Sequence, residues 1–148
     1  MKFVLPLLIM LLSGVADPRT VQDAPVTIAY EEVGPWETFR LAWHIDAAGA
    51  GSYERSGTTP GGDDRGAVQL DLTEFARLDD LLRPLDGAPQ LACPDAFTDQ
   101  GVRVLSWTRN GQITTFVLDR GCESKDASAI AARMEQANGI VRAAREQP

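Results

Sequence analysis

The stretch from Gly101 to Leu118, GVRVLSWTRNGQITTFVL, constrains the fold more than any other part of the chain. Two β-rich runs flank Asn110-Gly111, the dipeptide that most strongly favours a two-residue β-hairpin turn. Both central residues of a type I′ turn have positive φ, which Gly accepts freely and Asn tolerates. Such a turn also fixes the strand register. The pairs expected to face each other are Leu105 with Phe116, Trp107 with Thr114, and Val104 with Val117.

Alternation of apolar and polar residues predicts four further strands before this hairpin. Their expected inward-facing residues are Val26, Ile28 and Tyr30, then Phe39, Leu41, Trp43 and Ile45, then Tyr53, and finally Val68, Leu70 and Leu72. His44, the only histidine, falls on the polar side of the second strand. We expect a flexible loop over Ser56 to Gly66, because glycines, a proline and two adjacent aspartates are concentrated there.

Helical spacing of apolar residues replaces this alternation in two places. The first predicted helix begins with Thr73 as its cap and ends near Arg83, because Pro84 disfavours helical geometry in the residue before it. The second is predicted over Lys125 to Arg145, with Ser124 as a candidate N-cap. Gly139 could kink or end that helix.

The element order is therefore β-β-β-β-α-β-β-α within one domain over residues 26–146. Such an order predicts an α+β fold, with an antiparallel sheet of about five to six strands and two helices on one face. Leu41, Trp43, Leu105 and Phe116 are the residues that we expect to face the helices. On the opposite face of the hairpin lie Val102, Val104, Ile113 and Val117. We predict that the loop around Cys93 covers these four; the alternative is an exposed patch that binds a partner.

Residues 1–16 have the features of a secretory signal: Lys2, then an apolar run over Phe3 to Leu12, then small residues at Gly14 and Ala16. Cleavage before Asp17 would leave a loose lead over residues 17–25 and a secreted or periplasmic protein. The apolar run is shorter than the about 20 residues that span a bilayer. An uncleaved anchor or a core helix is the alternative.

The chain has two cysteines, and in an exported protein two cysteines most simply form one disulfide. Bridging Cys93 and Cys122 would close a long loop and stabilise the fold by about 3.6 kcal/mol through chain entropy. Two free thiols, or a metal site completed by His44, are the alternatives. The three side chains have no recognisable metal-ligand spacing, so we expect no metal.

The formal net charge is −7, and removal of Lys2 with the signal would make it more negative. Nucleic acids and anionic membranes repel such a chain, so we expect neither as a partner. A protein or peptide partner, including one with a basic surface, is compatible with this charge, although solubility alone also explains it.

The tip of the glycine-rich loop is a candidate binding loop, because binding residues often occupy exposed loops held by a rigid scaffold. Its residues are Thr58, Thr59, Pro60, Gly61, Gly62, Asp63 and Asp64. The loop lacks the Lys-Ser/Thr ending of a phosphate-binding loop and the alternating carboxylates of an EF-hand. An exposed hairpin tip without a binding role is the simpler interpretation.

A search for catalytic patterns yields little. The sequence has no G-x-S-x-G, H-E-x-x-H or G-x-G-x-x-G pattern, so we expect no catalytic residue set and no cofactor. The adjacent carboxylates, Glu31-Glu32, Asp63-Asp64 and Asp79-Asp80, are interpreted as solvated charge, since neighbours on a strand or helix point apart. A small hydrolase that uses His44 with a nearby carboxylate is the alternative to a non-catalytic binding module.

Two segments of the chain carry a family resemblance. They are Phe39-Arg40-Leu41, after a first strand and a glycine-containing turn, and the run from Leu72 to Leu82, LTEFARLDDLL. Together they resemble small bacterial domains of the emfourin type. Emfourin-like proteins inhibit thermolysin-like metallopeptidases, so the resemblance implies a binding, inhibitory role without naming inhibitory residues. Exported bacterial α+β domains of uncharacterised function are similar in strand-helix order. The signal, the glycine-rich hairpin and the predicted disulfide depart from the emfourin pattern.

Overall fold

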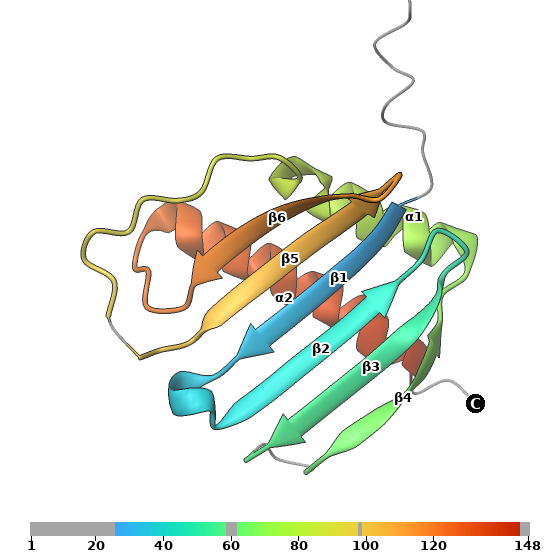
Figure 1. The fold of residues 1–148 in the computed structure, drawn as a ribbon, viewed down its shortest axis with the longest axis horizontal. Coiled ribbons are helices and arrows are strands. Elements are labelled where there is room, and N and C mark those ends of the chain that lie inside the picture. Colours follow the sequence, from blue (N-terminus) through green and yellow to red (C-terminus); the bar gives the residue numbers. More distant parts are fainter. Residues whose placement is uncertain (1–25, 59–61, 98, 146–148) are drawn as a thin grey trace, which may run out of the picture.

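A computed structural model describes residues 26–58, 62–97 and 99–145 (Figure 1). The strands are β1 (Val26–Val33), β2 (Phe39–Ile45), β3 (Ala50–Gly57), β4 (Asp64–Gln69), β5 (Val102–Arg109) and β6 (Gln112–Asp119). The helices are α1 (Leu72–Leu82) and α2 (Lys125–Arg145), with 3-10 turns at Pro35–Glu37 and Arg83–Leu85. The expected signal over residues 1–16, the lead over 17–25, and Thr59, Pro60 and Gly61 of the candidate loop lie outside the described residues.

The predicted α+β fold and its element order are confirmed. One antiparallel sheet has the strand order β4-β3-β2-β1-β5-β6. The first strand of the chain therefore lies in the middle, between the β2–β4 meander and the β5–β6 hairpin. Both helices lie behind the sheet in Figure 1, and α2 runs diagonally across it. The opposite face of the sheet is turned toward the viewer, and neither of the described helices lies over it.

The hairpin predicted over residues 101–118 forms. Asn110 and Gly111 have φ of 50° and 76°, the left-handed values that a type I′ turn requires. The expected cross-strand partners all pair: Leu105 with Phe116, Trp107 with Thr114, and Val104 with Val117.

The core lies between the sheet and the helices, and alternation along the strands selects its residues. Trp43, Leu105 and Phe116 are buried there as predicted, and Leu41 is half-buried against them. Trp43 stacks on Tyr30, with ring centroids 5.5 Å apart. Its indole Nε1 donates a 2.8 Å hydrogen bond to Asn138 Oδ1 of α2, which ties the long helix to the middle of the sheet.

The first helix begins earlier than the sequence predicted. Asp71 is the N-cap: its side chain accepts a hydrogen bond from the backbone N–H of Glu74, and the Glu74 carboxylate accepts one from the N–H of Asp71. This reciprocal capping box ends the extended segment after β4. Leu72, expected in the fourth strand, is consequently a helical residue with 73% of its surface exposed.

The second helix has the predicted bounds, Lys125–Arg145. Ser124 caps it, because the Ser124 hydroxyl oxygen accepts a 3.0 Å hydrogen bond from the N–H of Ala127. The helix continues through Gly139 without the kink or early end considered above.

Glu32 is buried, which corrects its interpretation as solvated charge. Only 4% of its surface is exposed. Two arginines pair with its carboxylate, Arg103 at 3.3 Å and Arg120 at 3.2 Å, and the Tyr30 hydroxyl donates to it at 2.7 Å. Burial, and then the nearby Glu32 charge, raise the pKa of Tyr30 far above its ordinary value. The cluster therefore compensates a carboxylate under the helices rather than presenting it to solvent.

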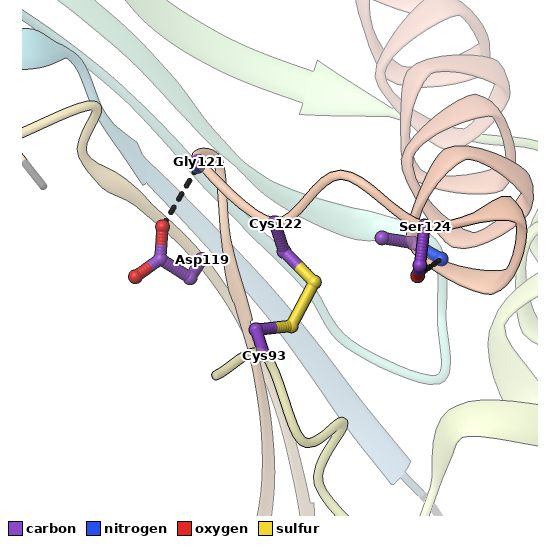
Figure 2. The surroundings of a disulfide bond; sticks show 6 residues. Cys93, Asp119, Gly121, Cys122 and Ser124 are labelled. Carbon is purple, nitrogen blue, oxygen red and sulfur yellow. Dashed lines mark hydrogen bonds between the residues drawn. A yellow bond between two sulfur atoms is a disulfide. The ribbon is translucent and has the colours of Figure 1, made fainter. Parts of the chain in front are cut away.

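The predicted disulfide is present (Figure 2). Cys93 and Cys122 are bonded, with their Cα atoms 5.5 Å apart. In the turn beside it, the N–H of Gly121 donates to Asp119 Oδ1 at 2.7 Å. The connecting segment over residues 86–97 runs along the outer side of β6. There the Gln90 carboxamide bonds the main chain of Thr115 and Val117.

The prediction that this segment covers the second face of the hairpin is wrong. Ile113 and Val117 are 67% and 40% exposed, and Val102 and Val104 are only half-buried. The segment borders the edge of β6 instead of crossing the face, because its hydrogen bonds go to outward-pointing backbone groups of that strand. These four residues lie on the uncovered side of the sheet.

Candidate functional site

The uncovered sheet face, the side of the sheet opposite α1 and α2, carries a hollow of about 300 Å³ near its centre. Ala29 of β1 and Ala42 of β2 line it together with larger side chains of the same and neighbouring strands. The register explains the hollow, since Ala42 pairs with Glu31 on one side and Glu54 on the other. Small side chains flanked by long ones leave a depression in an otherwise continuous surface.

Three charged residues border this hollow. Arg40 contacts the Glu31 carboxylate at 2.6 Å and the Glu54 carboxylate at 3.7 Å. The hydrogen bond to Glu31 is the main cause that raises the pKa of Arg40 above its ordinary value. All three side chains are about half exposed, so these pairs contribute little to stability. The two carboxylates are therefore accessible to a cationic group of a partner.

An apolar strip continues from the hollow toward β6. Val104 lines the hollow itself, and its cross-strand neighbour is Val117. Ile113, farther along β6, is the most exposed member of the strip. Apolar side chains gathered on an open face are typical of surfaces that bind other proteins.

His44 is exposed on this face, as the alternation predicted, and has a partner that the sequence did not reveal. Its Nδ1 lies 3.1 Å from the Ser52 hydroxyl on the adjacent strand. In the described part of the chain His44 has no ion pair with a carboxylate. The nearby Asp46 accepts hydrogen bonds from the backbone N–H groups of Ala48 and Ala50 instead.

This His44–Ser52 pair lacks the other parts of a hydrolytic site in the described structure. A histidine base is normally oriented by a third group, and an oxyanion needs free N–H donors nearby. The neighbouring strands β1, β2 and β3 are each paired on both sides, so their main-chain donors are used in the sheet. The His44–Ser52 pair can donate hydrogen bonds to a ligand or accept them from it. The groups that would support acyl transfer are not found beside it in the described structure.

The candidate binding loop is used largely to close the β3–β4 hairpin. Thr58 bonds the carbonyl of Thr38 through both its N–H and its hydroxyl. Asp63 accepts from the N–H of Gly57, and Asp64 pairs with Arg145 at 2.8 Å. The carbonyl of Gly62 accepts from Arg55 at 3.3 Å. These described loop residues make intramolecular contacts and do not line the hollow.

Both cysteine sulfurs are used in the disulfide, which removes them as metal ligands for a site with His44. Among the described residues, no three or more histidine, cysteine or acidic side chains are grouped as metal ligands would be. No described helix has the length and apolar character needed to cross a membrane. Neither protein-family models nor curated proteins match this chain.

Proposed function

We propose that this protein is an exported, non-catalytic binding module that engages a protein or peptide through its uncovered sheet face. The observation that carries the proposal is a six-stranded sheet with helices on one face and, on the other, a hollow beside an apolar strip. The disulfide fits an oxidising compartment outside the cytoplasm, in agreement with the signal predicted from the sequence.

The chemistry of the face suggests the kind of partner. Val104, Val117 and Ile113 offer apolar contact, while Glu31 and Glu54 offer negative charge next to the hollow. A partner segment that combines an apolar side chain with a flanking lysine or arginine would match both. The net charge of −7 would speed its approach to a basic surface.

The resemblance to emfourin-type domains makes thermolysin-like metallopeptidases the first partner class to test. Inhibition requires only that the domain bind at or near the substrate cleft. It therefore agrees with a face that carries recognition groups without a catalytic set.

Filling the hollow tests this proposal. Ala42→Arg places a long side chain in the hollow between Glu31 and Glu54, whose charges tolerate it. Ala132→Arg, on the exposed side of α2, is the matched control. We expect Ala42→Arg to weaken capture of exported proteins, or inhibition of a thermolysin-like peptidase, by at least about tenfold, or ~1.4 kcal/mol. Equal binding by both variants would refute a role for this face.

A small hydrolase is the second candidate, and the hydrogen-bonded His44–Ser52 pair is the observation in its favour. His44→Ala and Ser52→Ala are exposed substitutions that should leave folding intact. If the protein is a binding module, both variants keep any measured activity within a few fold. A loss of about a hundredfold or more in both, with an unchanged melting temperature, would favour the hydrolase.

A further inference from the structure

The two edge strands of the sheet, β6 and β4, differ in whether their outward backbone groups have hydrogen-bond partners. At the β6 edge, Gln90 Nε2 donates to the carbonyl of Thr115, and Gln90 Oε1 accepts from the N–H of Val117. A side-chain amide thereby occupies the place that a further strand would take. At the other end of the sheet, β3 is the only strand among the described residues that pairs with β4. An unprotected edge strand is a template for pairing with another chain.

The register identifies which β4 residues present their main chain outward. The N–H of Leu70 bonds the carbonyl of Gly49, so that opposed pair is a hydrogen-bonded one. Hydrogen-bonded and non-hydrogen-bonded pairs alternate along an antiparallel ladder. Arg65, Ala67 and Gln69, whose β3 partners are Glu54, Ser52 and Ala50, are therefore the residues with outward N–H and C=O groups.

Most of these groups have no partner in the described chain. The carbonyl of Arg65 accepts a 3.3 Å hydrogen bond from Arg145 Nη2 and keeps a second lone pair. Within residues 26–58, 62–97 and 99–145, no hydrogen bond reaches the outward N–H groups of Arg65, Ala67 and Gln69 or the carbonyls of Ala67 and Gln69. The β4 edge can therefore pair with a further strand through three alternate residues, Arg65, Ala67 and Gln69.

We propose that the β4 edge pairs antiparallel with β4 of a second copy of this chain, about a two-fold axis at Ala67. In that register Ala67 faces Ala67 of the other copy, and Arg65 faces Gln69 in both directions. Each of the three outward residues then belongs to a hydrogen-bonded pair across the interface, so every outward N–H donates to a carbonyl of the other copy. If the two-fold axis lay at Gly66 or Val68 instead, one of the three outward residues would have no residue of the other β4 strand opposite it.

The side chains of β4 suit this self-pairing. Opposed residues share a face, so two alanines meet at the axis and no like charges stand opposite each other. Arg65 faces an uncharged glutamine rather than a second Arg65. On the helix side, Gly66 would face Val68, and the Arg145 guanidinium group lies over Gly66. An unrelated peptide could use the same backbone groups, but this match of residues is specific to β4 itself.

The pairing would join two six-stranded sheets into one, with both uncovered faces on the same side. It does not depend on the proposed function, since the β4 edge and the central hollow are separate surfaces. A strand of six residues buries little area, which places the dimer among weak interfaces. We therefore expect reversible, concentration-dependent association.

Sedimentation equilibrium over a range of protein concentrations tests the pairing, and Ala67→Asp is the decisive variant. It sets two carboxylates face to face at the axis and, because Ala67 is exposed, it leaves the monomer folded. Ala132→Asp adds the same charge on α2 as a control. We expect dimers for the wild type and for Ala132→Asp, and at least about tenfold weaker association for Ala67→Asp.

Hydrogen exchange at the amide of Ala67 supplies a second readout that does not require a variant. Its protection should rise with protein concentration, since only the dimer gives this N–H a partner. A wild type that stays monomeric at all concentrations would overturn the proposal, as would a dimer that Ala67→Asp leaves unchanged. Protection of Ala67 only when a different protein is added would also overturn it, and would assign the edge to that protein.

Discussion

Neighbouring residues on β5 have opposite environments, and this difference can be measured. Leu105 is fully buried under the helices, whereas Val104 is half-buried on the uncovered face beside Glu31. Val104→Lys should therefore change the free energy of unfolding by less than about 1 kcal/mol. Leu105→Lys places an unpaired charge in the core and should unfold the domain or lower its stability by several kcal/mol. Thermal melting of both variants checks this, and equal destabilisation would mean that the face is covered.

Because Tyr30 is buried, the free energy of unfolding should decrease at alkaline pH. Its pKa is raised in the folded protein, first by burial and then by Glu32, relative to the usual value of about 10 in the unfolded chain. The folded state therefore keeps a proton that the unfolded state loses, so stability falls as pH rises above about 10.

The measurement is chemical unfolding at pH 8 to 11, with Tyr30→Phe as the control. We expect the wild type to lose stability over this range by a larger amount than Tyr30→Phe, which has no proton at that position. Phenolate absorbance from Tyr30 should appear only as the protein unfolds. A Tyr30 that ionises in the folded protein near its usual pKa would contradict this account.

The sequence predicted the position of a residue correctly where alternation alone determines which face of the sheet it lies on. It placed His44 outside and Trp43 inside correctly. It failed at Glu32, because a carboxylate on the inward side of β1 is stable only with partners far away in the chain. Arg103 lies on β5 and Arg120 directly follows β6, so both reach Glu32 only once these strands have paired, and no local pattern signals that.

At the scale of the elements, the capping box of α1 gives a prediction that separates two N-cap assignments. Asp71→Ala removes the acceptor for the N–H of Glu74 and should lower stability by about 1 kcal/mol. Thr73→Ala, at the residue that the sequence suggested as the cap, should change it by less than about 0.5 kcal/mol. Urea unfolding of the two variants compares them directly. A larger loss for Thr73→Ala would contradict the assigned helix start.

Elements with strong local sequence signals were predicted correctly. Element boundaries at which a strand signal and a helix signal overlap were not. The Asn110-Gly111 turn and the Ser124-capped α2 have signals within a few residues, and both form as expected. The start of α1 was misplaced because Val68, Leu70 and Leu72 continue the strand alternation, while the capping box at Asp71 ends it. β3 and β4 extend farther into the glycine-rich segment than predicted, because Arg55 pairs with Asp64.

At the scale of the whole molecule, the disulfide holds the long segment before β5 to the turn after β6. A Cys93→Ser, Cys122→Ser double variant should lose up to about 3.6 kcal/mol of stability through the entropy of the unfolded chain. The amide of Val117 should also lose protection from hydrogen exchange, because Gln90 lies on the segment that the bond anchors. Unchanged stability and exchange would mean that the segment is held by its other contacts.

The candidate site is a property of the assembled sheet and could not be predicted from the sequence. Ala29 and Ala42 are ordinary small strand residues, and they form a hollow only because β1 and β2 are adjacent in this register. Strand order depends on long-range pairing, which local patterns do not fix. The sequence indicated a patch at Val104 and Val117 but not that the patch borders the hollow.

If the uncovered sheet face binds a partner, site-specific photo-crosslinking from that face should capture the partner. A photoreactive phenylalanine analogue replaces Ala42 in the hollow or, as the control, Ala132 on α2, in the protein produced in its own cells. We predict a covalent adduct with a second protein from position 42 and none from position 132. An adduct from position 132 alone, or equal adducts from both positions, would show that the partner does not bind through the uncovered sheet face.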